Sequence, residues 1–469
     1  MFDDSPFTAR LGTNYVPSEE EIKDLRGLLV DPLEQLAKIQ AQIDEMDLLL
    51  DQLKARRDSF QTAIDAHRAL ISPMRRIPDD VLGEIFAACL PTEHNALIDL
   101  AEAPLLLGRI CRRWRAVSYS TPMLWSSIHI APLRSPWANE RSVDFFPQLK
   151  PVIQQWFERT VTCPLTVSLV EASSYASDPD THPISILRNF SHQFRHLSLA
   201  GDPRLLLPPL RLGPESLPVL KSIAIYNDTN RRYPFGIEHP EALNLLQIPT
   251  LTDISLRVMV DPLSLPLNWS QLTHLDIRCF PPTRDSGLDG VGALELLQRC
   301  PNLMRCRLGL YKGLHDSSLA SNTSLITLPH LHTLILVGTF QLPNWISHFD
   351  VPQLRRLQIG NDGWLLGVPN SPHSMIVAVD TTPFTESSLL ELLQAFPLIS
   401  HLQLLPHRLL PASLPNDALL LHLSSTHNLC PNLTHLRIKT DCTSLSDATA
   451  LAFIQARMAS PDAAPTIRG

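Results

Sequence analysis

The chain has 469 residues, a formal net charge of −8 and 44% hydrophobic residues, so it is long enough for several domains or one repeat array. Its acidic excess argues against general nucleic-acid binding, which calls for a basic surface. No uninterrupted apolar run of about 18 residues occurs, so we expect no membrane span. The eight cysteines form no Cys-x-x-Cys pair and residues 1–4 do not resemble a secretory signal, which predicts reduced thiols and a cytoplasmic and/or nuclear protein.

Residues 1–30 form a mixed, partly acidic stretch that we expect to be a flexible arm. Residues 31–71 predict one long helix like a coiled-coil strand, with Pro32 ahead of its apolar seam and Pro73 closing it. Their apolar side chains recur in alternating steps of three and four, typical of a heptad seam. The seam comprises Leu36, Ile39, Ile43, Met46, Leu50, Leu53, Phe60 and Ile64.

Such a seam must be covered to be stable. It can form a homodimer through residues 36–67, fold against the helices that follow, or bind another protein. Arg57 and His67 occupy seam positions, and polar residues there weaken an isolated dimer. The sequence leaves the three alternatives open.

Residues 72–125 contain two short amphipathic segments. Pro78 suits the first turn of a helix, and Asp79 and Asp80 favour the positive end of its dipole. One face of this first segment is apolar, with Ile77, Val81, Leu82, Ile85 and Phe86. The second segment places Leu106, Ile110, Trp114 and Val117 on one face, opposite several arginines.

In this order the residues resemble an F-box of the fungal F-box-like type. The likeness rests on Ile77-Pro78, the acidic pair, Val81-Leu82, Ile85-Phe86, the Cys-Arg-Arg-Trp-Arg of residues 111–115 and the extension at 121–125. A connection at 87–107 is longer than in the compact form. The resemblance implies docking onto the small adaptor subunit of SCF-type cullin-RING ubiquitin ligases, whereas a generic helix pair would pack on the rest of its own chain. The implied adaptor-binding residues are Ile77, Pro78, Val81, Leu82, Ile85, Phe86, Ile110 and Trp114.

After residue 125 the pattern predicts a strand at 126–130, a helix at 145–160, a strand at 165–169 and a polar loop at 173–181. An apolar-x-x-apolar-x-apolar motif then recurs nine times. It begins at Phe194, Leu220, Leu251, Leu272, Leu303, Leu331, Leu354, Ile399 and Leu433. In seven instances a proline stands two residues earlier, where we expect it to end a helix and lead into a strand.

Helical patterns at 292–297, 388–393 and 418–424 separate some of these strands, and 375–379 predicts a degenerate strand. A capped terminal helix is expected at 446–458 and a tail at 459–469. The units over residues 126–458 resemble an irregular leucine-rich-repeat solenoid. The expected fold class is therefore mixed α/β, with a long helix and an F-box-like module ahead of the solenoid. A non-repetitive α/β domain is the alternative.

No catalytic or metal-binding motif was found, so we expect no enzyme activity, no cofactor and no metal. The glycines around Gly287 precede a helix without a leading strand, which favours a turn over a phosphate cradle. Histidines recur two residues after several motif starts, at His196, His274, His401 and His435. They are expected to be solvated strand positions, and a contact surface or an enzyme site using them or the Gly287 loop is the alternative.

Positions two, four and six after each motif start should share one open face of the strands. On that face arginine and lysine outnumber the opposing Asp253 and Asp276. The candidate target-binding residues there are Arg257, Arg278, Arg305, Arg307, Arg356 and Arg437, with Lys439 beside them. Guanidinium groups suit carboxylates and phosphates, so we hypothesise an acidic or phosphorylated protein ligand.

Together these features predict a substrate-receptor subunit of an SCF-type ubiquitin ligase. Its partners would be the adaptor subunit, the cullin complex and an unknown protein substrate, with neither nucleic acid nor membrane involved. Holding a target near the ubiquitin-carrying enzyme needs no catalytic residue in this chain. The alternative is a coiled-coil and repeat scaffold without a role in ubiquitin transfer.

Overall fold

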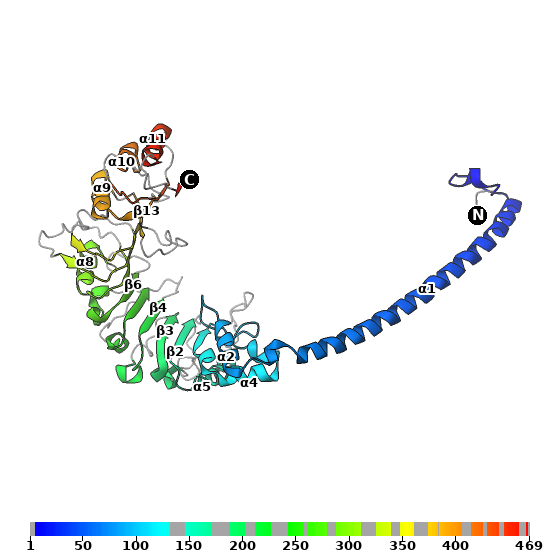
Figure 1. Ribbon diagram of the computed structural model, residues 1–469, viewed down its shortest axis with the longest axis horizontal. Coiled ribbons are helices and arrows are strands. Elements are labelled where there is room, and N and C mark those ends of the chain that lie inside the picture. Colours follow the sequence, from blue (N-terminus) through cyan, green and yellow to red (C-terminus); the bar gives the residue numbers. More distant parts are fainter. Residues whose placement is uncertain are drawn as a thin grey trace. The chain divides into compact units, whose positions relative to one another are not determined.

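The computed structural model describes residues 5–131, 146–170, 187–201, 212–226, 243–257, 261–278, 288–310, 325–338, 348–360, 374–382, 384–405, 414–424, 429–439, 445–458 and 466–467 (Figure 1). The polar loop predicted at 173–181 and Gly287 lie outside these residues. The chain divides into two compact units, Met1–Leu82 and Gly83–Gly469.

The first unit consists mainly of the helix α1 (Glu19–Leu70), with single 3-10 turns at Thr8–Arg10 and Pro73–Arg75. The helix begins at Glu19 and not after Pro32, so residues 19–30 of the expected flexible arm are helical. Ser18 explains this start: its hydroxyl accepts the Glu21 N–H at 3.3 Å, and the Glu21 carboxylate accepts the Ser18 N–H at 2.8 Å. This capping box satisfies two backbone donors. Pro32 costs the helix one hydrogen bond but does not end it.

The seam predicted on α1 lies on the surface of the described chain. Its exposed fractions run from 42% for Ile43 to 61% for Leu36 and Met46.

Three helices follow: α2 (Asp79–Ala88), α3 (Leu107–Ile110) and α4 (Arg112–Ser120). The second amphipathic segment was expected to be one helix, but it breaks at Cys111, whose φ of −156° and ψ of 171° are extended. The Cys111 sulfur accepts the Trp114 N–H at 3.4 Å and so caps α4. Because of this break, Val117 is buried while Ile110 is exposed, and the predicted single apolar face does not form.

The long connection between α2 and α3 is packed onto the sheet. Leu97 forms a parallel bridge with His129, and the His129 N–H donates to the Ala96 carbonyl at 2.8 Å. The Asn95 amide donates to Ser168 Oγ at 2.9 Å. This connection thus extends the edge of the sheet.

The second unit is built on one large parallel sheet whose thirteen described strands run in chain order: β1-β2-β3-β4-β5-β6-β7-β9-β11-β12-β13-β14-β15. Their bounds are Ser127–Ile130, Leu165–Val170, Phe194–Ala200, Ser222–Tyr226, Asp253–Arg257, His274–Arg278, Arg305–Gly309, Thr333–Val337, Arg356–Gly360, Met375–Val379, Ile399–Leu404, His435–Ile438 and Thr466–Ile467. Every adjacent pair is parallel. The sheet therefore advances by one strand at each step along the chain.

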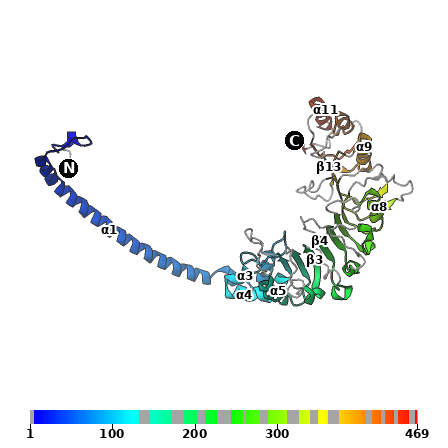
Figure 2. The same ribbon diagram turned by 180° about the vertical axis from the view of Figure 1, so that it is seen from behind.

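The described helices that follow α4 are α5 (Phe146–Glu158), α8 (Gly290–Gln298), α9 (Glu386–Ala395), α10 (Asp417–His422) and α11 (Asp447–Met458). Helices α8 and α9 lie on the same side of the sheet in both views (Figures 1 and 2). A separate parallel pair, β8 (Ile326–Thr327) with β10 (Phe349–Asp350), was not predicted. Strand β15 pairs with β14, so the predicted tail is wrong at Thr466–Ile467.

The prolines ahead of the repeats have a more specific role than expected. In all seven cases the residue before the proline accepts a hydrogen bond from the N–H of the apolar residue that opens the motif, as in Ile248 with Leu251 and Leu328 with Leu331. Each proline is thus residue two of a four-residue β-turn, where its fixed φ is favourable. The turn places the first apolar side chain of each repeat inward, and Leu220, Leu251 and Leu303 are fully buried.

Candidate functional site

The predicted adaptor-binding residues fall into an inner and an outer group. Leu82 and Phe86 are fully buried, and the Phe86 ring lies 4.8 Å from that of the half-buried Trp114. Phe86 on α2 and Trp114 on α4 thus form part of a small core. Their side chains support this part of the fold and leave little surface for a partner.

The outer group remains accessible. Val81 is 46% exposed, Ile85 36% and Ile110 54%, and Pro78 is exposed as well. Val81 and Ile85 lie one turn apart on α2, so they share a helix face. Ile77 is half-buried.

Two tryptophans join the helices α2–α4 to the sheet. Trp125 and Trp156 are both buried, with their rings edge to face at 4.8 Å. Trp125 Nε1 donates to the Ser118 carbonyl at 2.9 Å, and Trp156 Nε1 donates to the Trp125 carbonyl at 2.8 Å. Since Ser118 lies on α4, Trp125 in the turn before β1 and Trp156 on α5, these contacts hold α4 and α5 against the turn that leads into the sheet.

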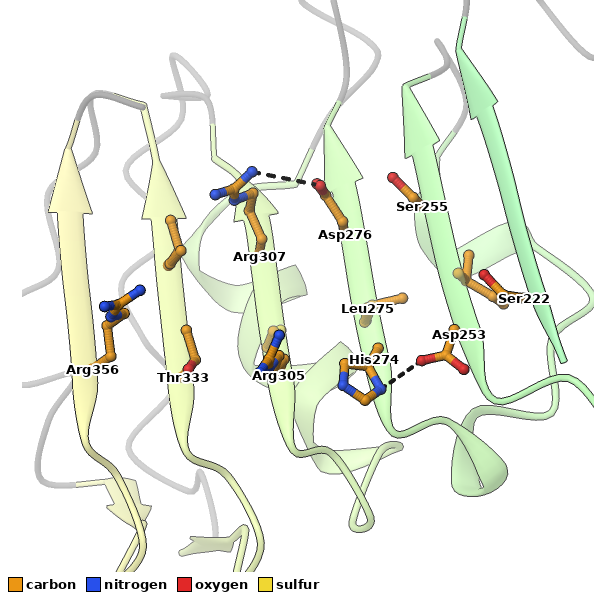
Figure 3. Close-up of a pocket in the computed structure, with 13 residues that line it drawn as sticks. Ser222, Asp253, Ser255, His274, Leu275, Asp276, Arg305, Arg307, Thr333 and Arg356 are labelled. Carbon is orange, nitrogen blue, oxygen red and sulfur yellow. Dashed lines mark ion pairs between the residues drawn. The ribbon is translucent and has the colours of Figure 1, made fainter. Parts of the chain in front are cut away.

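The open face of the strands carries the predicted arginines, and their alternation with buried residues follows the expected spacing. The structure brings Arg305, Arg307 and Arg356 together around an open hollow of about 380 Å³. Figure 3 shows these side chains on strands β7 and β11, with Thr333 of β9 between Arg305 and Arg356. The hollow is also lined by Asp253, His274 and Asp276, and by Ser222, Ser255, Ile254, Leu275, Cys306 and Ile335.

The acidic residues of the hollow already have partners. Arg278 donates from Nε and Nη2 to the two carboxylate oxygens of Asp276, each at 2.9 Å. Arg307 Nη1 lies 3.8 Å from the same carboxylate. His274 Nδ1 lies 2.5 Å from Asp253 Oδ1.

The remaining predicted arginines are elsewhere on the sheet. The Arg257 guanidinium lies 4.9 Å from the centre of the Tyr226 ring, a cation–π contact. Arg437 is exposed on β14 and Lys439 follows that strand, and neither lines the hollow. The predicted face is therefore real, but its six arginines do not form one cluster.

Three of the four recurring histidines contact the hydroxyl of the residue before them, which was not predicted. Thr273, Ser400 and Thr434 precede His274, His401 and His435, and each hydroxyl lies 2.9–3.0 Å from the Nδ1 of the histidine that follows. Each of these hydroxyls also lies within hydrogen-bond distance of a backbone carbonyl in or next to the preceding strand. The recurring Ser/Thr-His pair in the sequence is the signal that would have found it.

The alternatives based on catalysis gain no support from the described residues. The Gly292 N–H donates to the Asp289 carboxylate at 2.7 Å, so the start of α8 is capped by its own chain. Within the described ranges, no cluster of three or more His, Cys, Asp or Glu side chains could hold a metal ion. No described helix is both long and apolar enough to cross a membrane.

None of the protein-family models matches the chain, and a search of the curated proteins gave no match either.

Proposed function

We propose that this chain is the substrate-receptor subunit of an SCF-type ubiquitin ligase. The helices α2–α4 would dock onto the adaptor subunit, and the open face of the sheet would bind the target protein. The observation that carries the proposal is the division of the α2–α4 side chains: Phe86 and Trp114 pack together, while Val81, Ile85 and Ile110 stay exposed. Exposed aliphatic side chains on a supported helix pair suit a partner surface.

The fold proposed for the target-binding part is a leucine-rich-repeat-like solenoid. Its support is the order of the sheet, in which each repeat adds one parallel strand beside the last. Such an array has an extended face rather than a single deep pocket. The Trp125–Trp156 contact would keep that face at a fixed offset from the adaptor.

Capture by the purified SCF adaptor tests the proposal. We expect the intact chain to be captured, and the double variant Val81→Glu/Ile85→Glu to lose at least about tenfold in affinity, because each glutamate would be desolvated at the interface. These positions are better probes than Trp114, whose removal would disturb the core around Phe86. The matched control is Leu398→Glu, which also places a charge at an exposed aliphatic position.

Circular dichroism should show that both variants remain folded. If folded Val81→Glu/Ile85→Glu binds the adaptor as tightly as the intact chain, α2 is not the docking surface. If the folded intact chain is not captured at all, the scaffold function without ubiquitin transfer takes its place.

A further inference from the structure

The acidic side chains of the hollow lie on β5 and β6, and its arginines lie on β7 and β11. The register of the sheet places Asp253, His274, Arg305, Thr333 and Arg356 side by side in one row across β5, β6, β7, β9 and β11. Carboxylates occur only at the β5 and β6 end of the row and in Asp276 above it, whereas Arg305 and Arg356 occupy the other end (Figure 3). The hollow is thus polarised and not uniformly basic.

At the basic end, two guanidinium groups flank one hydroxyl. Arg305 and Arg356 stand two strands apart, a Cα separation of roughly 10 Å, and Thr333 lies between them. Arg305 is exposed and makes no ion pair with any described residue. Partial burial, and then the Arg305 charge, lower the pKa of Arg356, which indicates that the two cations interact.

An anion placed between them would relieve this repulsion. Arginine forks bind the oxygens of phosphate by paired, charge-assisted hydrogen bonds, and a hydroxyl can donate a third bond. A compact group with two negative charges fits this end of the row. A single carboxylate carries only one charge, and an acidic stretch that reached the other end of the hollow would meet Asp253 and Asp276.

We infer that Arg305, Thr333 and Arg356 form a binding site for a single phosphate group carried on a serine or threonine of a protein ligand. The nearly buried Ile335 lines the same hollow and offers an apolar contact to a neighbouring residue of the bound peptide. This inference adds to the proposed function by naming the chemical group that the target would carry. It rests on the proposed function only for the identity of the ligand as the target of the ligase. It narrows the choice between acidic and phosphorylated ligands to phosphorylated ones.

Three fluorescein-labelled peptide pools test the site, with random flanks around a fixed central phosphoserine, glutamate or serine. Fluorescence anisotropy with the full-length chain should give at least about tenfold tighter binding for the phosphoserine pool than for the other two, because only the phosphate is dianionic. Equal binding of the phosphoserine and glutamate pools would overturn the inference. The inference would also be overturned if inorganic phosphate displaced the labelled phosphoserine pool at the same concentration as unlabelled phosphoserine peptides do. That result would indicate a site for free phosphate.

Single substitutions show which residues bind the phosphoserine pool. Arg305→Gln should weaken binding of the phosphoserine pool by about tenfold, and Arg305→Lys by less, since lysine keeps the charge but loses the fork. The matched control is Arg188→Gln, at an exposed arginine outside the strands and outside the hollow, which should change affinity less than about twofold. Arg356→Gln provides a second probe of the same site. If folded Arg305→Gln binds the phosphoserine pool like the intact chain, the site is wrong.

Adaptor capture separates this inference from the proposed function. Arg305→Gln should be captured by the adaptor as well as the intact chain is. Phosphopeptide binding by a chain that the adaptor does not capture would refute the ligase function and leave the phosphate site standing. Adaptor capture with no preference for phosphoserine would refute the phosphate site alone.

Discussion

On the open face of the sheet, neighbouring side chains decide how much charge each arginine offers to a ligand. Arg278 and Asp276 are two residues apart on β6, so they point the same way and form a two-pronged ion pair. Arg307 shares that carboxylate at 3.8 Å. Arg305 has no such neighbour within the described part of the chain. Spacing in the sequence predicts which residues share the face, but pairing across strands depends on the register, which the sequence did not reveal.

Histidine protonation provides a prediction at the same scale. The rings of His401 and His435 stack with their centres 4.1 Å apart. Burial, and then His435, lower the pKa of His401. The unfolded chain therefore binds the proton more readily than the folded chain does. This contribution to stability is complete above the ordinary histidine pKa of about 6.5 and is lost as the pH falls below it.

Urea unfolding at about pH 7.5 and about pH 5.5 measures this effect. We expect a lower unfolding midpoint at the acidic pH and a smaller difference between the two conditions in His401→Gln. His192→Gln, at an exposed histidine outside the strands, is the matched control and should keep the full difference. An unchanged pH dependence in His401→Gln would contradict the assigned role of His401.

Among the elements, the turns ahead of the strands explain the prolines that precede the repeats. The chain contains 41 prolines, and the seven that precede repeats each occupy the second position of a β-turn. A proline there has no N–H to leave unpaired and lowers the conformational entropy of the unfolded chain. The sequence showed the spacing of proline and leucine, but only the backbone hydrogen bonds show that the two belong to one turn.

The helix pair near the C-terminal end of the sheet depends on one buried arginine. Arg457 of α11 is 5% exposed, and its guanidinium donates to the carbonyls of Leu423, Leu429 and Cys430 at 2.5–3.2 Å. Leu423 is the C-terminal cap residue of α10, so Arg457 satisfies a carbonyl at the end of that helix.

Replacing Arg457 by methionine would keep an apolar stem but remove every donor. We expect Arg457→Met to lower the free energy of unfolding by about 3 kcal/mol, because buried carbonyls would lose charge-assisted hydrogen bonds. Chemical denaturation measures the loss. Arg437→Met, at an exposed arginine, should stay within about 0.5 kcal/mol of the intact chain. A similarly small effect of Arg457→Met would show that these bonds contribute little.

At the scale of the whole molecule, the sequence predicted the strands of the recurring motif but missed several short strands and the start of α1. Leucines at fixed spacing specify strands such as β4 to β7, and the degenerate strand predicted at 375–379 is β12. Short elements such as β8, β10 and β15 have too few residues for a periodic signal. The start of α1 was missed because Pro32 was given more weight than the Ser18–Glu21 capping box.

The sequence identified which residues belong to the candidate sites but not which of their side chains are exposed. Amphipathic spacing identified Val81, Ile85, Phe86 and Trp114 together. It could not separate the exposed pair from the packed pair, because burial depends on where the neighbouring helix lies. The adaptor-binding role of these residues remains a prediction.

The mass of a complex between the purified intact chain and the SCF adaptor, measured by size-exclusion chromatography with light scattering, tests the central claim most directly. We expect one adaptor bound to each chain, and no complex when the chain carries Val81→Glu/Ile85→Glu. The folded intact chain running as a separate species from the adaptor would contradict the claim that this protein is a ligase receptor.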